Sequence, residues 1–156
     1  MQLRNASPEE QPSLLAVGNP KMPFDEIPAL PAASNEVRKV IEIMALPKSD
    51  ILVWTRATKK RVISIMEDYK ILHFATHGIV DEENSHGDYS MRGFLVLASS
   101  DDKHCSGLLS AEEIRGMRLS AELVVLSCCE TGRGKVSGDG VLGRFLFEDS
   151  FYIFSF

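Results

Sequence analysis

Short, continuous apolar runs alternate along this chain with stretches in which apolar residues recur every three or four positions. The runs are rich in Val, Ile and Leu and predict β-strands that are buried on both faces. The three-and-four spacing predicts amphipathic helices, each of which turns one apolar stripe toward such a sheet. Strands are expected at 14–17, 50–55, 71–78, 93–100 and 122–130, and helices at 34–46, 58–69 and 108–119.

Polar residues at the predicted helix starts support these limits. Thr58 is placed to cap the second helix, and Ser110 with Glu113 forms a capping-box pattern in the third. Either Ser34 or Asn35 is placed to cap the first helix, which ends before Pro47. The sequence Gly-Asn-Pro at 18–20 predicts a turn directly after the first strand.

The alternation of strands and helices predicts an α/β fold. Right-handed crossovers would give a mainly parallel sheet flanked by helices on both faces. A chain of 156 residues suits one domain with a substantial core. Residues 1–12 are polar and contain prolines, so we expect a disordered segment or a linker there.

Composition argues against several kinds of partner and indicates the cellular compartment. A net charge of −5 argues against nucleic acid, which binds basic surfaces. The three cysteines (Cys105, Cys128 and Cys129) are too few for a disulfide scaffold, which indicates a reducing compartment, the cytoplasm or the nucleus. The chain has neither a signal-peptide pattern nor an apolar run long enough to span a membrane, so no membrane partner is expected.

The strands at 71–78 and 122–130 both end in residues that carry chemistry. His77 lies at the end of the first strand, directly before Gly78, and Cys129 lies at the end of the second, directly before Glu130. The carboxyl ends of parallel strands share one edge of the sheet, where ligands gather. If the two strands are neighbours, ~4.8 Å apart, the imidazole can take the thiol proton and create a strong nucleophile. The pattern therefore predicts a candidate cysteine–histidine dyad.

Three further residues complete this hypothesis. Gly78 lets a substrate approach the backbone closely, and its N–H could form an oxyanion hole with the N–H of Cys129. Glu130 and Asp139 are candidates for the substrate cleft, where a carboxylate would select a basic side chain. The plainer interpretations stay open: solvated loop acids, a structural histidine and a cysteine buried as a small hydrophobe, which we expect for Cys128.

No metal or cofactor is predicted. His73 and His77 share a strand face but lie about 13 Å apart at ~3.3 Å per residue, too far for one zinc ion. We expect His73 to pack or to hydrogen-bond within the sheet. The glycine-rich stretch at 131–140 lacks the Ser or Thr of a phosphate loop after Lys135, and Ser137 replaces the third glycine of a dinucleotide pattern.

Several motifs occur in a fixed order: LLAVGNP, LPAASNEV, ILHFATHGIVDEEN, SGLLSAEEIRGMRL and LVVLSCCETGRGKVSGDGVLG. Over about residues 14–143 they resemble the CHAT family, caspase-like domains often appended to tetratricopeptide repeats. The resemblance implies a caspase-like three-layer sandwich, a peptide or protein substrate, and a tetratricopeptide-repeat region in the full-length protein. It also implies that His77 is the catalytic histidine and that Cys129, directly before Glu-Thr-Gly, is the nucleophile.

The resemblance stops after Gly143. We therefore expect a partial CHAT-like domain at 13–143 and a divergent aromatic tail at 144–156, with no further strand, as in a truncated product. The strand of the nucleophile would then have an unpaired edge, which should impair activity. The leading hypothesis is a cysteine endopeptidase with a Cys–His dyad. A catalytically silent interaction or scaffold module and a nonfunctional fragment remain the alternatives, so whether the chain is an enzyme stays open.

Overall fold

The computed structural model describes residues 11–81, 92–100, 106–130 and 151–155. In this part of the chain seven strands form one mixed sheet. Five parallel strands lie in the spatial order β2–β1–β3–β6–β7. They are β1 (Ser13–Pro20), β2 (Lys48–Trp54), β3 (Ile71–Asp81), β6 (Leu123–Glu130) and β7 (Phe151–Ser155).

Two short strands continue the sheet beyond the end of β1. β4 (Arg92–Val96) pairs antiparallel with the last residues of β3, and β5 (Leu108–Ser110) pairs antiparallel with β4. The carboxyl end of β3 therefore lies between β6 on one side and β4 on the other. The sheet is partly parallel, and its parallel part contains both strands of the predicted site.

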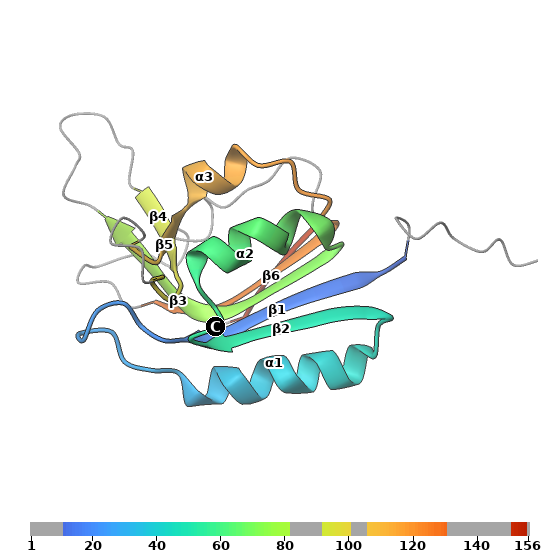
Figure 1. Cartoon of the computed structure of the whole chain (residues 1–156), viewed down its shortest axis with the longest axis horizontal. Helices are drawn as coiled ribbons and strands as arrows, with labels where there is room; N and C mark the ends of the chain where they lie inside the picture. Colours follow the sequence, from blue (N-terminus) through green and yellow to red (C-terminus); the bar gives the residue numbers. More distant parts are fainter. Residues whose placement is uncertain (1–10, 82–91, 101–105, 131–150, 156) are drawn as a thin grey trace, which may run out of the picture.

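Helices cover both faces of the sheet, as predicted (Figure 1). α1 (Pro31–Met44) lies on one face, whereas α2 (Lys59–Ile65) and α3 (Ala111–Arg115) lie on the other. A 3₁₀ turn, η1 (Met66–Asp68), follows α2 directly. The protein thus has a mixed α/β fold.

The larger core lies between the sheet and the helices α2 and α3. It combines alternate residues of β3 and β6 with the apolar faces of those helices. Its buried members include Leu72, Phe74, Val124, Leu126, Val62, Met66 and Ile114. Burial of one such large side chain contributes roughly 1.5–3 kcal/mol, so this face carries most of the hydrophobic stabilisation.

The core between the sheet and α1 is smaller and contains small residues: Ala16, Ala33, Val37 and Ala75. Gly18 lets the helix approach the sheet closely here. A Cβ at Gly18 would lie 2.7 Å from the carbonyl oxygen of Ala33 and 2.8 Å from a methyl of Val37. The close approach fixes the start of α1 against the end of β1.

Two of the three predicted helix caps are confirmed. Thr58 accepts a hydrogen bond from the Arg61 N–H, and Ser110 with Glu113 forms a complete capping box. The cap predicted for α1 is wrong, because the helix begins at Pro31 with Leu30 as N-cap and has no side-chain cap. Proline needs no N–H partner at that position. The helix ends at Met44, before Pro47 as expected.

Several predicted boundaries need correction. β1 continues through Gly-Asn-Pro to Pro20, because the β2 pairing persists across a register irregularity at this point. Residues 108–110 form β5 rather than helix, since they pair with β4, and α3 is limited to Ala111–Arg115. β3 extends to Asp81 because β4 pairs with its last residues.

The expectation that no strand follows residue 143 is also wrong. β7 pairs in parallel with β6 from Leu123↔Phe151 to Ser127↔Ser155. The aromatic tail supplies β-branched and aromatic residues, which suit a strand beside a buried neighbour. β6 therefore has a partner on each side over these residues. The domain division at 143 stays a prediction, and the predicted linker at 1–12 lies largely outside the described residues.

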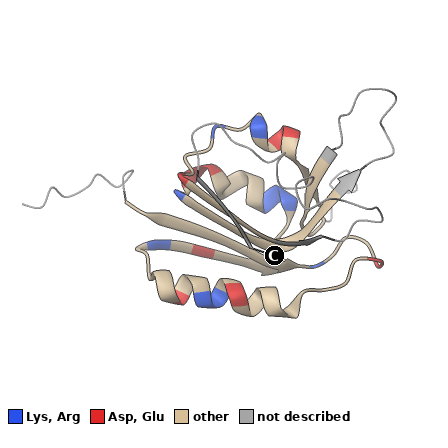
Figure 2. Cartoon of the chain, turned by 180° about the vertical axis from the view of Figure 1, so that it is seen from behind, with Lys and Arg blue, Asp and Glu red and all other residues tan. Residues whose placement is uncertain are grey.

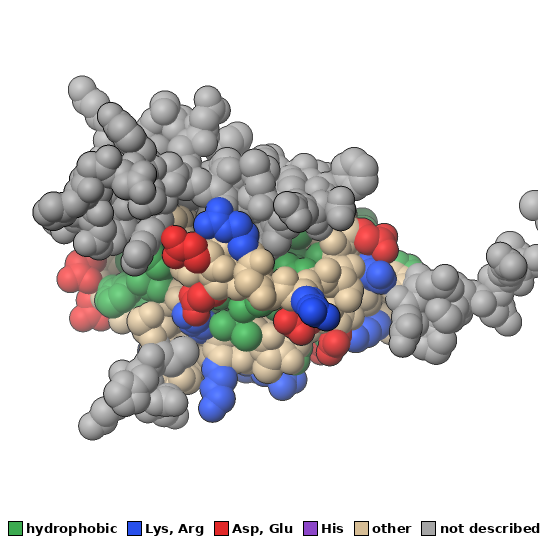
Figure 3. Space-filling model, turned by 90° about the horizontal axis from the view of Figure 1, so that it is seen from above, with side chains coloured by type: hydrophobic (Ala, Val, Ile, Leu, Met, Phe, Trp, Pro, Cys, Tyr) green, Lys and Arg blue, Asp and Glu red, His purple; other side chains and the backbone are tan. Residues whose placement is uncertain are grey.

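The surface mixes charges of both signs. In Figure 2 the helices carry Lys and Arg beside Asp and Glu, and Figure 3 shows the same mixture over the face seen from above. Lys59 binds Glu113 at 2.6 Å, and Lys70 binds Glu122 at 3.2 Å. None of the helices among the described residues combines the length and the apolar character of a membrane-spanning helix.

Candidate active site

The two strands of the predicted dyad are neighbours. β3 and β6 pair in parallel from Ile71↔Leu123 to Gly78↔Glu130. In this register His77 stands opposite Cys129, and Thr76 stands opposite Cys128. Register partners in adjacent strands lie about 4.8 Å apart across the sheet. The sheet therefore brings the backbones of His77 and Cys129 to the same level.

The His77 side chain is buried, with 2% of its surface exposed. Its Nε2 lies 2.8 Å from the carbonyl oxygen of Pro28. A carbonyl oxygen only accepts, so Nε2 carries a proton and donates it. In the neutral ring Nδ1 is then the nitrogen with a free lone pair, the form that a general base needs.

Nδ1 of His77 is itself unusual. It is buried and has no hydrogen-bond partner among the residues that the structure describes. Buried polar atoms are paired in the great majority of cases, because an unpaired one costs about 1–3 kcal/mol. An unpaired basic nitrogen on the residue that stands opposite Cys129 in the register suits a general base.

Pro28 was not identified from the sequence. It lies in the proline-containing segment between β1 and α1, which the pattern predicted only as irregular. The functional group is a backbone carbonyl, and every residue has one. Only the fold shows which carbonyl reaches the histidine.

His73 and His77 lie on the α1 face of β3 and have different partners. His73 donates from Nε2 to Oε1 of Glu36 in α1, at 2.8 Å. The expected packing role of His73 thus takes the form of a bond to the helix rather than one within the sheet. No group of three potential metal ligands occurs in the described parts of the chain.

Gly78 is buried inside β3. Its register partners are Leu95 in β4 and Glu130 in β6. For Cys129 and Glu130 the structure gives the backbone positions, whereas Asp139 lies outside the described residues. The oxyanion and cleft assignments remain predictions.

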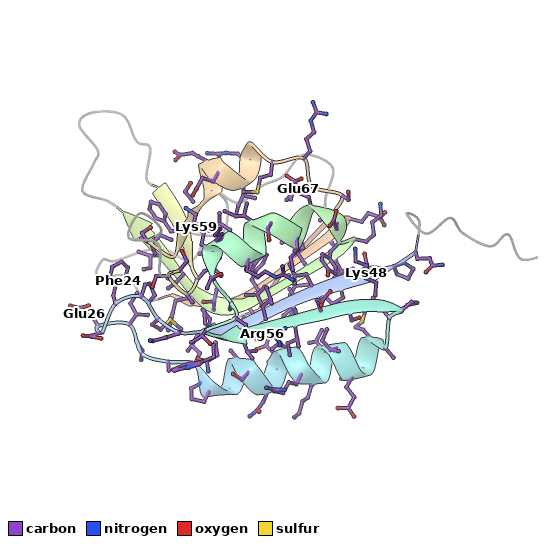
Figure 4. The ribbon with its side chains drawn as sticks, viewed as in Figure 1. Phe24, Glu26, Lys48, Arg56, Lys59 and Glu67 are labelled. Carbon is purple, nitrogen blue, oxygen red and sulfur yellow. The ribbon has the colours of Figure 1, made fainter. Side chains whose placement is uncertain are left out.

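Exposed aromatic side chains lie at the same edge of the sheet as His77. Trp54 ends β2 with a φ of 55° and is 48% exposed. Phe24 is 42% exposed and lies, with Glu26, in the segment that leads to Pro28 (Figure 4). Lys48, by contrast, begins β2 at the opposite edge (Figure 4).

Comparison with known proteins identifies the same family that the sequence motifs resemble. The model of the CHAT domain family matches residues 1–152. The chain is 29% identical to mouse tetratricopeptide repeat protein 28 and 27% identical to the human protein of that name, each over 157 aligned residues. Each alignment covers 81% of this chain and 6% of the relative, so the chain spans a small part of the length of these proteins.

Proposed function

Because this chain belongs to the CHAT domain family, a caspase-like family, we propose that it is a cysteine endopeptidase domain with a caspase-like three-layer fold. Cys129 is the nucleophile and His77 the general base. The observation that carries this proposal is the β3–β6 register, which sets His77 opposite Cys129 while Nδ1 of His77 has no partner among the described residues.

The reaction follows from these positions. Nδ1 of His77 takes the thiol proton, and Sγ of Cys129 attacks the carbonyl carbon of the scissile peptide. The N–H groups of Gly78 and Cys129 hold the oxyanion of the tetrahedral intermediate. The imidazolium then protonates the leaving amine, and a thioester remains. Water, deprotonated by His77, hydrolyses the thioester and regenerates the thiol.

The carbonyl of Pro28 assists both proton transfers. It accepts the Nε2–H of His77 in the neutral ring and in the imidazolium, so the ring keeps its orientation while Nδ1 gains and loses a proton. Such an orienting hydrogen bond is the usual second element behind a catalytic histidine.

Strand alternation favours Cys129 over Cys128. Successive residues of a strand point to opposite faces, and register partners share a face. Cys128 is the partner of Thr76, whose hydroxyl donates to the Val96 carbonyl at 2.6 Å. Cys129 is the partner of His77. We therefore assign Cys128 a packing role.

Substrate and setting are part of the same proposal. The substrate is a peptide or protein, and Glu130 and Asp139 belong to its cleft. A free thiol nucleophile is kept reduced in the cytoplasm and the nucleus, which supports either compartment as its location. The similarity to repeat proteins supports a tetratricopeptide-repeat region as a partner within a longer protein.

Turnover of a peptide library by the purified chain tests the proposal. Cys129→Ala and His77→Gln should abolish cleavage, whereas Cys128→Ala should retain it. Equal turnover by the wild type and Cys129→Ala would refute the mechanism. Activity lost in Cys128→Ala but kept in Cys129→Ala would reverse the choice between the cysteines.

The burial of His77 favours a second candidate, a catalytically silent interaction module. A ring with 2% exposure suits a structural histidine as well as a base. This function predicts that a thiol-directed peptide electrophile leaves Cys129 unmodified, while a recombinant tetratricopeptide-repeat region of the mouse relative still binds the chain. Stoichiometric labelling at Cys129 would instead support the peptidase.

A further inference from the structure

We propose that Asn19 is a positioning residue that sets the proton arrangement on His77, because it holds the loop whose Pro28 carbonyl contacts the ring. The structural part of this proposal is independent of catalysis. Its consequence for turnover rests on the peptidase function proposed above.

Asn19 uses both ends of its side-chain amide. It lies near the end of β1, is 8% exposed, and has a φ of 42°. Its Oδ1 accepts from the backbone N–H of Leu30 at 2.8 Å, and its Nδ2 donates to Oγ of Ser34 at 3.0 Å. Asparagine is among the few residues that adopt a left-handed backbone readily while bonding nearby main chain.

These two bonds join β1 to the start of α1. Leu30 is the N-cap residue of α1, and Ser34 lies in the first turn of the helix. The close approach of Ala33 at Gly18 brings this turn within reach of Asn19. The amide therefore connects the strand to a helix start that has no side-chain cap of its own.

The segment from Leu30 back to Pro28 is short and stiff. Only Ala29 separates the two residues, and the rings of Pro28 and Pro31 restrict the backbone on both sides. Holding the N–H of Leu30 thus holds the carbonyl of Pro28, which accepts from Nε2 of His77 at 2.8 Å. The connection from Asn19 to the imidazole passes through one anchored N–H and one carbonyl.

Loss of the anchor has a defined consequence. Without Asn19 the Pro28 carbonyl is no longer fixed over Nε2, so the ring can place its proton on either nitrogen and can rotate. A proton on Nδ1 would remove the lone pair that the proposed general base needs. Asn19 is therefore expected to act on His77 without touching a substrate.

Nitrogen-15 NMR of chain labelled at histidine measures this effect directly, since the two ring nitrogens report where the proton sits. The wild type should show His77 with its proton on Nε2. Asn19→Gly tolerates the left-handed backbone but lacks the amide, so it should show a mixture of both tautomers. Asn19→Asp keeps the acceptor for Leu30, and the Ser34 hydroxyl can donate to its carboxylate in place of the lost amide contact, so it should retain the wild-type pattern.

A matched control separates positioning from general loosening of α1. Glu36→Gln weakens the bond of His73 to the same helix but leaves the Asn19 contacts in place. It should leave the His77 signals unchanged. Ser34→Ala removes only the Nδ2 contact and should shift the tautomer ratio in the direction of Asn19→Gly, but less. It provides the test if Asn19→Gly does not fold.

These experiments distinguish the positioning role of Asn19 from the proposed peptidase function. In an active chain, Asn19→Gly should lower kcat on the order of 10²-fold, as for a misplaced catalytic group, with KM little changed and Asn19→Asp restoring the rate. Wild-type His77 signals in both Asn19→Gly and Ser34→Ala would overturn the positioning role. An altered tautomer in a chain with no peptidase activity would leave the positioning role standing and reject the proposed function.

Discussion

The two faces of the sheet differ sharply in how they are built. Along β3, Leu72 and Phe74 face α2 and α3 within the larger apolar core, whereas His73, Ala75 and His77 face the α1 side. One face is held by large side chains that exclude water. The other is held by small residues and by side-chain hydrogen bonds: His73–Glu36, Asn19–Ser34 and His77–Pro28.

This difference separates stability from chemistry within one strand. Nonpolar burial is undirected and tolerates exchange of similar side chains, whereas hydrogen bonds fix atoms in particular orientations. The α1 face holds the groups that need an orientation, and the opposite face supplies the free energy that keeps them there. Substitutions on the two faces should therefore differ in how strongly they lower stability.

Phe74→Ala should destabilise the protein most. It removes a large buried side chain from the major core, which typically costs about 3–5 kcal/mol. Its sequence neighbour Ala75 lies in the small core by α1, and Ala75→Gly should cost only about 0.5–1 kcal/mol. Urea unfolding measures both. Equal losses for the two variants would contradict the asymmetry.

Gly18→Ala should act on the α1 face by crowding. The added Cβ would lie 2.7 Å from the Ala33 carbonyl, and such overpacking costs typically about 1–3 kcal/mol. The variant should also disturb the His77 signals, because the start of α1 must move. Gly116→Ala is the control, since the nearest atom to its added Cβ lies 3.4 Å away. Thermal unfolding measures both variants. A lower melting temperature for Gly116→Ala than for Gly18→Ala would refute the close packing.

Tyr69→Phe tests a polar contact at the margin of the major core. The Tyr69 hydroxyl donates to Oδ2 of Asp50, and Lys48 lies 4.4 Å above the ring. Loss of the hydroxyl should cost about 1 kcal/mol. A double-mutant cycle with Asp50→Asn should show coupling between the two positions. Additive losses would exclude the contact as a source of stability.

The same tyrosine predicts a pH dependence at the alkaline end. Burial, the hydrogen bond to Asp50 and the charge of Asp50 all raise the pKa of Tyr69 above the ordinary tyrosine value of 10.0. A raised pKa means that its stabilising contribution is complete below this ordinary value and declines as pH rises above it. Unfolding free energies measured across the alkaline range, from about one unit below to about one unit above the ordinary tyrosine pKa, should fall less steeply in Tyr69→Phe. An identical slope would contradict this.

The smallest effect is expected at Glu113. Burial alone would raise its pKa, but hydrogen bonds from Lys59 and from the Ser110 backbone lower it overall. Its contribution is therefore present above the ordinary glutamate pKa of 4.5 and is lost as pH falls through the lower folded-state value. Glu113→Gln should reduce the acid sensitivity of stability slightly, as measured by urea unfolding across the acid range. An unchanged dependence on pH would contradict the assignment.

Local sequence signals predicted much of the fold. Thr58, Ser110 and Glu113 marked helix starts because their side chains satisfy N–H groups within the same turn. Apolar runs identified the principal strands, and their alternation with helices predicted that the carboxyl ends of β3 and β6 share one edge of the sheet. The structure shows that the two strands are also neighbours. These features depend on residues close in sequence or on general rules of parallel sheets.

The errors concern pairings between distant segments. The short strand β5 and the tail strand β7 form through pairing with β4 and β6, and although the residues of β7 suit a strand, their local pattern does not show which neighbour they join. The Pro28 carbonyl and the Asn19 amide escaped notice for the same reason. Gly-Asn-Pro suggested a turn, yet the chain stays paired with β2 there. The Asn19 side chain instead accepts a hydrogen bond from the backbone N–H of Leu30.

Alkylation of Cys129 tests the central claim most directly, in a chain that carries Cys105→Ser and Cys128→Ser so that one thiol reports. If His77 activates this thiol, iodoacetamide should modify the parent at neutral pH about tenfold or more faster than the same chain with His77→Gln, because only the thiolate reacts. Equal alkylation rates in the two folded proteins would show that the histidine and the cysteine do not act together.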